Sequence, residues 1–211
     1  MPDTRFVCVV DDDRAVRDSM LMMLNTAGYP VKAFATAEEF LEEYVPEETA
    51  CLILDIRMPG KSGLELQEHL NSVKSKVPVV FVSGHGDVPV SVRAIKGGAL
   101  DFLEKPFSRE TLLRRVQEAL EISHRRRASE QERKKLLQRF DRLTPREREV
   151  LLHVVAGRQN KEIARLLEIS YRTVELHRTR MMEKMSAQSL PELVAMAVRC
   201  GVHEIGAPPN S

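Results

Sequence analysis

The chain has 211 residues, of which 43% are hydrophobic and 30% are charged, the composition of an ordinary globular protein. Its length suits one large domain or two small ones. No apolar stretch approaches the roughly 18–20 residues that span a bilayer, and the apolar run at residues 6–10 is too short for a secretory signal. We therefore expect a cytoplasmic protein that makes no contact with a membrane.

Charge is divided unevenly between the two halves of the chain. Residues 1–120 carry 14 Lys or Arg and 19 Asp or Glu, giving −5, whereas residues 121–211 carry 18 and 12, giving +6. This asymmetry predicts different partners, with an anionic surface or nucleic acid facing the second half. Cys8, Cys51 and Cys200 are too few and too far apart for a disulfide framework, which favours free thiols in a reducing compartment. The histidines show no metal-binding spacing.

The first 120 residues alternate short apolar runs with amphipathic stretches. Short, apolar and β-branched runs suit strands that are covered on both faces. Five such repeats predict an α/β fold, doubly wound and flavodoxin-like, with a five-stranded parallel sheet. The expected strands are residues 6–10, 31–34, 51–54, 79–82 and 99–103. The expected helices are residues 14–27, 37–44, 63–73 and 88–96, and a last helix from about residue 109.

A charged segment follows this domain. Residues 123–135 contain Ala128 as their one apolar residue, so the segment cannot bury itself in a core. Opposite charges four residues apart, such as Glu130 and Lys134, favour a solvated helix that continues from the first domain. A disordered linker is the alternative. We therefore divide the chain into a first domain at 1–121, a charged linker at 122–140 and a second domain at 141–211.

The second domain carries the start and stop signals of four short helices. Thr144 has Pro one residue on and Ser189 has Pro two residues on, and each has Glu three residues on, a capping signature. Gly157 ends the first of these helices and Ser170 caps the third. Two short helices joined by a tight turn, the second of them basic, are typical of a helix-turn-helix within an all-α, four-helix domain. The first expected helix begins at residue 145. The other three span about residues 161–167, 171–185 and 190–200.

Polar side chains follow four of the apolar runs in the first domain, where each strand is expected to end. Because ligands bind beyond the carboxyl ends of parallel strands, we expect these side chains to form one site. Singly, each has an ordinary explanation as a helix cap, a turn or a surface residue. Their order on consecutive strand ends favours a shared site instead. The set comprises Asp11, Asp12, Asp55, Ser83 and Lys105.

The chemistry of this set suits phosphoryl uptake with magnesium. Mg²⁺ prefers hard oxygen ligands and only one or two carboxylates, with water and phosphate completing its shell. Asp12 and Asp55 would supply the carboxylates and Arg57 a backbone carbonyl, while Asp11 would bind through water or orient a carboxylate. Asp55 is the expected nucleophile, forming an acyl phosphate.

Two further groups would sense the phosphoryl group. Lys105 would pair with one phosphoryl oxygen, and the Ser83 hydroxyl would donate to another. A cis Lys105–Pro106 bond would aim Lys105 inward, but the sequence leaves the isomer open.

Four segments of the first domain resemble those of a known family. Residues 1–120 resemble a response-regulator receiver domain in the segments VVDDD, LILDIRMPG, FVSGHGD and DFLEKPF. The FixJ subgroup is especially similar in GHGDVPVSVRAIKGGALDFLEKPF. This resemblance implies phosphorylation of Asp55 by a sensor histidine kinase, with Mg²⁺ or Mn²⁺ as cofactor.

The resemblance also implies a switch that ends in dimerisation. Ser83 would move toward the phosphoryl group, and the residue three before Lys105 would rotate inward. That residue is Phe102 here, where the family commonly has Tyr, so it cannot form a hydroxyl hydrogen bond. The change would reshape a surface that holds Val92 and Lys96, through which receivers of this subgroup form homodimers.

The helix expected at 171–185 presents two faces at helical spacing. Val174, Met181 and Met185 should pack inward. The opposite face would meet base edges in a major groove, and a flanking set would contact phosphates. The outward face comprises Arg172, Glu175, Leu176, Thr179, Arg180 and Glu183, and the phosphate set comprises Lys161, Thr173, His177 and Arg178. A solvated helix face is the plainer alternative.

Residues 143–200 resemble the LuxR/NarL-type DNA-binding domain. The matching segments are LTPREREVL, NKEIARLL, TVELHRTRMMEKM and SLPELVAMAV. The resemblance implies base contact by Glu175, Leu176 and Thr179, and a dimer contact on DNA through the last helix. It also implies double-stranded promoter DNA and RNA polymerase as partners.

Together, these observations favour a phosphorylation-activated transcription factor that is not an enzyme. An enzyme of the same architecture, such as a phosphoaspartyl phosphatase or a nucleotide-binding protein, is a second hypothesis. Neither GxxxxGK[ST] nor GxGxxG follows any expected strand, which argues against nucleotide use. A DNA-binding protein with a degenerate receiver is a third. Whether the unphosphorylated DNA-binding half is masked or merely monomeric stays open.

Overall fold

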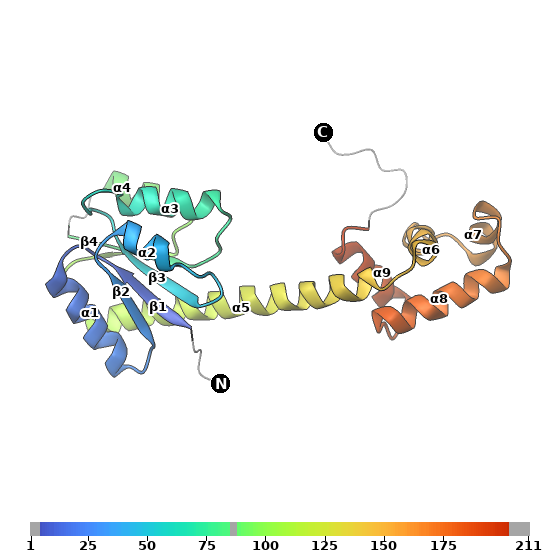
Figure 1. The fold of residues 1–211 in the computed structure, drawn as a ribbon, viewed down its shortest axis with the longest axis horizontal. Helices are drawn as coiled ribbons and strands as arrows, with labels where there is room; N and C mark the ends of the chain where they lie inside the picture. The colour runs from blue at the N-terminus through green and yellow to red at the C-terminus, as the bar shows by residue number, and fades with distance from the viewer. Residues whose placement is uncertain (1–4, 85–87, 203–211) are drawn as a thin grey trace. The chain divides into compact units, whose positions relative to one another are not determined.

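The computed structural model describes residues 5–84 and 88–202 (Figure 1). The chain divides into two compact units, Met1–Arg127 and Ala128–Ser211. Within the described ranges, no helix combines the length and the apolarity needed to span a bilayer.

The first unit is a parallel sheet of five strands in the order β2-β1-β3-β4-β5. The strands are β1 (Phe6–Val10), β2 (Val31–Phe34), β3 (Thr49–Asp55), β4 (Val79–Ser83) and β5 (Asp101–Glu104). The helices between and after them are α1 (Arg14–Thr26), α2 (Ala37–Glu43), α3 (Gly63–Ser72), α4 (Val88–Lys96) and α5 (Arg109–Asp141). The predicted doubly wound α/β fold is confirmed.

Alternate residues of the central strands supply two cores on opposite faces of the sheet. On one face, Cys8 and Val10 pack with side chains of α2, α3 and α4. On the other, Val7 and Val9 pack with α1 and the first part of α5, and Figure 1 shows these two layers of helices. β3 is buried along its whole length, which is why its sequence is a continuous apolar run rather than an alternating one.

Strand β5 begins two residues later than the sequence predicts. Residues 97–99 are still hydrogen-bonded to the end of α4, because the amides of Gly97, Gly98 and Ala99 donate to carbonyls of residues 93–95. Gly98 has a φ of 92°, a left-handed conformation that favours glycine and turns the chain toward the sheet. Ala99 is therefore buried but lies outside the strand.

Helix α5 contributes to the cores of both units. Leu112, Val116 and Ala119 pack in the first unit, whereas Leu136 packs in the second. The predicted linker, residues 122–140, is helical throughout, and the boundary between the units falls inside it, after Arg127.

In its described residues, 128–202, the second unit contains four further helices around one core. They are α6 (Pro145–Val155), α7 (Asn160–Leu166), α8 (Tyr171–Met185) and α9 (Leu190–Arg199). The predicted caps are present, since Thr144, Ser170 and Ser189 each accept a hydrogen bond from a backbone amide in the first turn of their helix. The predicted all-α second domain is confirmed.

A buried carboxylate ties α6 to α8. Glu147 is 2% exposed, completes the capping box with Thr144, and accepts a hydrogen bond from Lys184 Nζ at 2.7 Å. Although burial raises the pKa of Glu147, the hydrogen bonds from Lys184 and Thr144 hold that pKa below its ordinary value. Because the folded-state pKa is depressed, this contribution to stability is complete above the unfolded-state pKa and is lost as the pH falls.

We expect Glu147→Gln to destabilise the second unit by about 1–2 kcal/mol at pH 7, because one charged acceptor is lost. The difference from wild type should shrink below about pH 4, as the wild-type carboxylate itself becomes protonated. Hydrogen exchange of the α6 and α8 amides measures both effects. Glu149→Gln removes an exposed pair with Arg146 and serves as the control, with a cost under about 1 kcal/mol. An equal cost for both variants would contradict the prediction.

Candidate functional site

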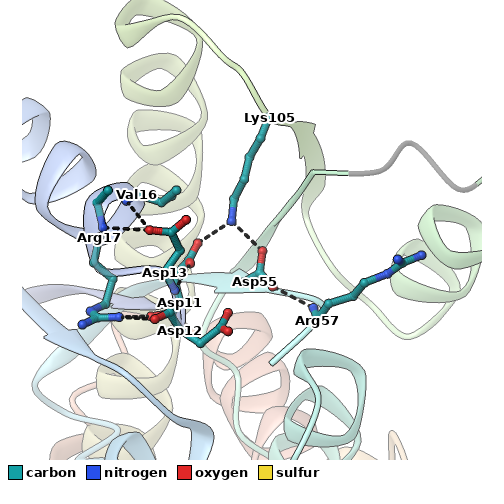
Figure 2. A network of polar contacts seen from close by, with 9 residues as sticks. Asp11, Asp12, Asp13, Val16, Arg17, Asp55, Arg57 and Lys105 are labelled. Carbon is teal, nitrogen blue, oxygen red and sulfur yellow. Dashed lines mark hydrogen bonds and ion pairs between the residues drawn. The ribbon is translucent and has the colours of Figure 1, made fainter. Parts of the chain in front are cut away.

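The carboxyl ends of β1, β3 and β5 bring three of the predicted residues into direct contact (Figure 2). Lys105 Nζ donates to Asp11 Oδ2 at 2.6 Å and to Asp55 Oδ1 at 2.7 Å. In the order β2-β1-β3-β4-β5, the strands β1 and β3 flank the point where the connections change direction, and this is where ligands bind in open α/β sheets. One ammonium thus bridges two carboxylates on neighbouring strand ends.

Both carboxylates are withdrawn from water. Asp11 is 0% and Asp55 5% exposed. Burial raises the pKa of Asp55, and the nearby Asp11 charge acts in the same direction, while Lys105 opposes both. Burial lowers the pKa of Lys105, but its hydrogen bonds to the two carboxylates outweigh this and hold the pKa above its ordinary value. The cluster therefore keeps its ammonium charged.

The remaining oxygens of the two buried carboxylates also accept hydrogen bonds. The Asp13 amide donates to Asp11 Oδ1 at 3.0 Å, and the Arg57 amide donates to Asp55 Oδ2 at 2.7 Å. Asp12, in contrast, is exposed, and Figure 2 shows its side chain in the same loop. Both oxygens of Asp11 are thus engaged within the protein, whereas Asp12, the predicted carboxylate ligand, is exposed.

The donors at the end of β3 and in the loop after β1 suit magnesium in kind. No group of three or more His, Cys, Asp or Glu side chains that could hold a metal ion occurs in residues 5–84 and 88–202. Mg²⁺ needs only one or two carboxylates, since water, carbonyl and phosphate oxygens complete its shell. Asp12, Asp55 and the Arg57 carbonyl are such hard oxygen donors. We conclude that the residues present fit magnesium.

The predicted hydroxyl lies at the end of β4. Ser83 is 3% exposed, and its carbonyl accepts the Lys105 amide at 2.7 Å, so the backbone of the two residues is joined directly. The Lys105–Pro106 bond is cis. Phe102 is half-buried against the core on the α4 face of the sheet. Of the motif FVSGHGD, residues 85–87 lie outside the described residues.

Gly63 contributes to the site in a way that the sequence reasoning missed. Its amide donates to the Ile56 carbonyl at 3.0 Å, and a Cβ placed on Gly63 would overlap the Asp55 carbonyl oxygen. The first turn of α3 thus packs directly on the end of β3. Beyond the glycine itself, the sequence carries no signal of this contact, because any backbone carbonyl could be the one that is approached.

Helix α4 exposes apolar side chains on the predicted dimer surface. Val92 is 45% exposed, Lys96 is also exposed, and Val88 and Ile95 are 69% and 47% exposed. Three exposed aliphatic side chains on one short helix suit a surface that a partner covers.

In the second unit, α8 has the two faces that the sequence predicts. Val174, Met181 and Met185 are completely buried. The outward set is exposed throughout: Arg172, Glu175, Leu176, Thr179, Arg180 and Glu183.

Two side chains of the predicted phosphate set form polar contacts within the second unit. Arg178 Nη1 donates to Asn160 Oδ1 in α7 at 2.6 Å, and the Thr173 hydroxyl lies 2.7 Å from that of Ser170. His177 is half-buried, whereas Lys161 is exposed. Arg178 therefore also fixes α8 against α7, a role that helical spacing alone did not reveal.

Comparison with known families gives a consistent result for each unit. Residues 7–117 match the response regulator receiver domain, and residues 141–197 match the bacterial regulatory proteins of the luxR family. A receiver domain joined to a luxR-family unit is the arrangement of a family of transcription regulators, which is not a class of enzymes.

Individual relatives match over nearly the full length. The transcriptional regulatory protein FixJ of Azorhizobium caulinodans is 45% identical over 96% of each chain, and that of Rhizobium meliloti is 43% identical over 92% of this chain and 96% of its own. Among solved structures, the response regulator StyR matches with a TM-score of 0.84 and 42% identity, covering 93% of this chain and 99% of its own. Full-length FixJ from B. japonicum matches with a TM-score of 0.56 and 40% identity, covering 95% and 98%.

The five-stranded receiver fold, the helix-turn-helix unit and the full-length relatives all indicate the same family. The chain belongs to the FixJ-like response regulators, transcription regulators that join a receiver domain to a LuxR-type DNA-binding domain.

Proposed function

We propose that a sensor histidine kinase phosphorylates this protein on Asp55, and that phosphorylation promotes dimerisation and binding to promoter DNA. The observation that carries the proposal is the Lys105 ammonium, which lies 2.6 Å from Asp11 and 2.7 Å from Asp55 at the carboxyl edge of the sheet. An ammonium held there pairs with an anion delivered to Asp55. Because the output is promoter binding, the protein works in the cytoplasm, with RNA polymerase as a further partner.

In the transfer, an Asp55 carboxylate oxygen attacks phosphorus. The bond from phosphorus to the donor histidine nitrogen breaks as the new P–O bond forms, and the leaving imidazole takes up a proton. Lys105 and the Ser83 hydroxyl hold phosphoryl oxygens in line. Asp12, Asp55 and the Arg57 carbonyl would hold magnesium, which would neutralise part of the charge on the phosphoryl group when bound.

The signal then passes from the site to the α4 surface. Lys105 now has a phosphoryl oxygen as a competing partner, Ser83 moves toward that group, and Phe102 turns into the space that is released. The surface around Val92 and Lys96 changes shape and pairs with a second copy. Two DNA-binding units held in one dimer gain effective concentration on a palindromic site.

On DNA, the exposed face of α8 enters the major groove. Glu175, Leu176 and Thr179 contact base edges, and Arg172 and Arg180 lie on the same face, where either is able to read guanine. Lys161, Thr173, His177 and Arg178 contact phosphates, which position the helix without reading sequence. The exposure of the first five side chains supports this assignment.

Acetyl phosphate with Mg²⁺ provides the test. Wild type should gain one phosphoryl mass, become dimeric and bind its operator on the order of 100-fold more tightly. Asp55→Asn should gain none of these properties. Intact mass, sedimentation and DNA titration at fixed salt measure the three outcomes. The absence of an adduct on wild type would overturn the phosphorylation claim, and an adduct with unchanged DNA affinity would overturn the coupling.

The variant Val92→Asp locates the dimer surface within the same experiment. A carboxylate on the exposed apolar face of α4 should repel its symmetry mate, so the variant should be phosphorylated but stay monomeric. Glu42→Lys changes a remote exposed charge on α2 and should dimerise as wild type does. Dimers of phosphorylated Val92→Asp as stable as those of wild type would place the interface elsewhere.

A further inference from the structure

Residues 11–13, between β1 and α1, form an acidic loop. Arg17 contacts this loop from the side opposite Lys105. Its Nη1 donates to the Asp11 carbonyl at 2.6 Å and to the Asp12 carbonyl at 2.9 Å. Figure 2 shows the guanidinium reaching back from α1 to the backbone of the loop, whereas Lys105 meets the Asp11 side chain from the other side. One side chain therefore holds two consecutive carbonyls.

These carbonyls follow the last residue of β1 and precede the first residue of α1, so neither is held by the regular sheet or helix pattern. The ends of the loop are fixed. The Asp11 carboxylate accepts Lys105 and the Asp13 amide, and Asp13 caps α1. The orientation of the peptide groups between them determines where the Asp12 carboxylate points, and Arg17 restrains that orientation.

We propose that Arg17 is a positioning residue, which fixes the Asp11–Asp12 backbone so that the Asp12 carboxylate is presented to magnesium. This inference rests on the proposed magnesium-dependent phosphorylation of Asp55. Groups that orient metal ligands typically change metal affinity by about 10–100-fold when they are removed. A restraint on an otherwise exposed ligand belongs at the lower end of that range.

The sign of the effect separates positioning from simple charge. The Arg17 guanidinium is a cation near a cation site, so by Coulomb's law alone its removal would tighten Mg²⁺ binding. Positioning predicts the opposite, because the Asp12 carboxylate would lose its fixed direction. A merely structural role predicts a lower unfolding temperature without a change in the Mg²⁺ affinity of the folded protein.

The test uses the full chain with Arg17→Met, which keeps the aliphatic stem and removes the donors. Calorimetric titration with MgCl₂ should show affinity weakened by about 10-fold. In phosphorylation by acetyl phosphate, the Mg²⁺ concentration for half-maximal rate should rise in parallel, while the rate at saturating Mg²⁺ stays near that of wild type. Arg17→Lys retains the charge and a donor and should recover part of the affinity.

Arg14→Met is the matched control. Arg14 lies on the same helix, is 87% exposed and pairs with Asp18 rather than with the loop. Its removal makes the same charge change and should leave Mg²⁺ affinity unchanged or slightly higher. Wild-type Mg²⁺ affinity in Arg17→Met, or equal weakening in Arg14→Met, would overturn the inference. If Arg17→Met does not fold, wild-type affinity in Arg17→Lys overturns it instead.

The same titrations keep this inference distinct from the proposed function. If wild type binds Mg²⁺ and becomes phosphorylated but the Arg17 variants bind Mg²⁺ as wild type does, only the role of Arg17 fails. If wild type neither binds Mg²⁺ nor gains a phosphoryl group, the proposed function fails.

Discussion

Replacing Gly63 with alanine should destabilise the first unit by about 3 kcal/mol, at the upper end of the usual cost of overpacking. The added methyl would overlap the Asp55 carbonyl oxygen and lie 3.0 Å from the Asp55 carbonyl carbon and 3.1 Å from Ile56 Cα. These are backbone atoms at the end of a fully buried strand and cannot rotate away. Either α3 or the end of β3 must therefore move.

That movement should also reach the chemistry of the site. Asp55 is the proposed nucleophile, and a displacement of about 1 Å is enough to slow a reaction by about 100-fold. Hydrogen exchange of the β3 and α3 amides measures the stability, and the initial rate with acetyl phosphate measures the chemistry. Gly84→Ala is the control for stability, because its methyl group meets no heavy atom within 4 Å. Equal destabilisation by both substitutions would contradict the prediction.

Replacing Lys105 with methionine should cost the first unit about 3 kcal/mol at pH 7, because two buried carboxylates lose their shared cation. One carboxyl should then take up a proton, with a folded-state pKa well above the ordinary value near 4. A raised carboxyl pKa gives stability that is present at low pH and lost as the pH rises. The deficit relative to wild type should therefore shrink toward pH 4.

Urea unfolding at pH 4.5 and pH 7.5, followed by hydrogen exchange in the sheet, measures this pH dependence. Adding Asp11→Asn should recover much of the loss, since one of the two repelling charges is removed. Lys32→Met is the control, because Lys32 makes long pairs with Glu43 and Glu48 at 3.8 and 4.0 Å and a cation–π contact with the Phe6 ring, rather than pairs with buried carboxylates. A deficit that is independent of pH, and that Asp11→Asn does not relieve, would show that lost packing dominates instead.

The pattern of apolar residues and the helix-capping signatures predict the fold well, because both depend on local sequence. The buried run ending at Asp55 and the capping signatures at Thr144 and Ser189 depend only on nearby residues. Parallel strands share their carboxyl edge, so the nearness of Asp11, Asp55 and Lys105 also follows from the sequence pattern.

The contacts to backbone groups could not be predicted in the same way. Arg17 binds carbonyls, Gly63 leaves space for a carbonyl, and the start of β5 depends on how residues 97–99 close α4. Every residue has a carbonyl, so the sequence does not mark which one will be approached. Such contacts depend on how neighbouring elements pack, and that becomes visible only in three dimensions.

Helix α5 contributes residues to both units, and this determines where two response regulators of this kind can be joined in a chimaera. The family matches end at residue 117 and resume at residue 141, yet the first unit also uses Ser123, which bonds to Arg5, and Arg126 and Arg127, which donate to loop carbonyls. The second unit already uses Leu136. A chimaera joined at residue 121 would strip these contacts from the input half. A junction in the exposed stretch 128–135 leaves both sets of contacts to buried or backbone groups intact, provided that the number of residues is kept so that the helical phase is preserved.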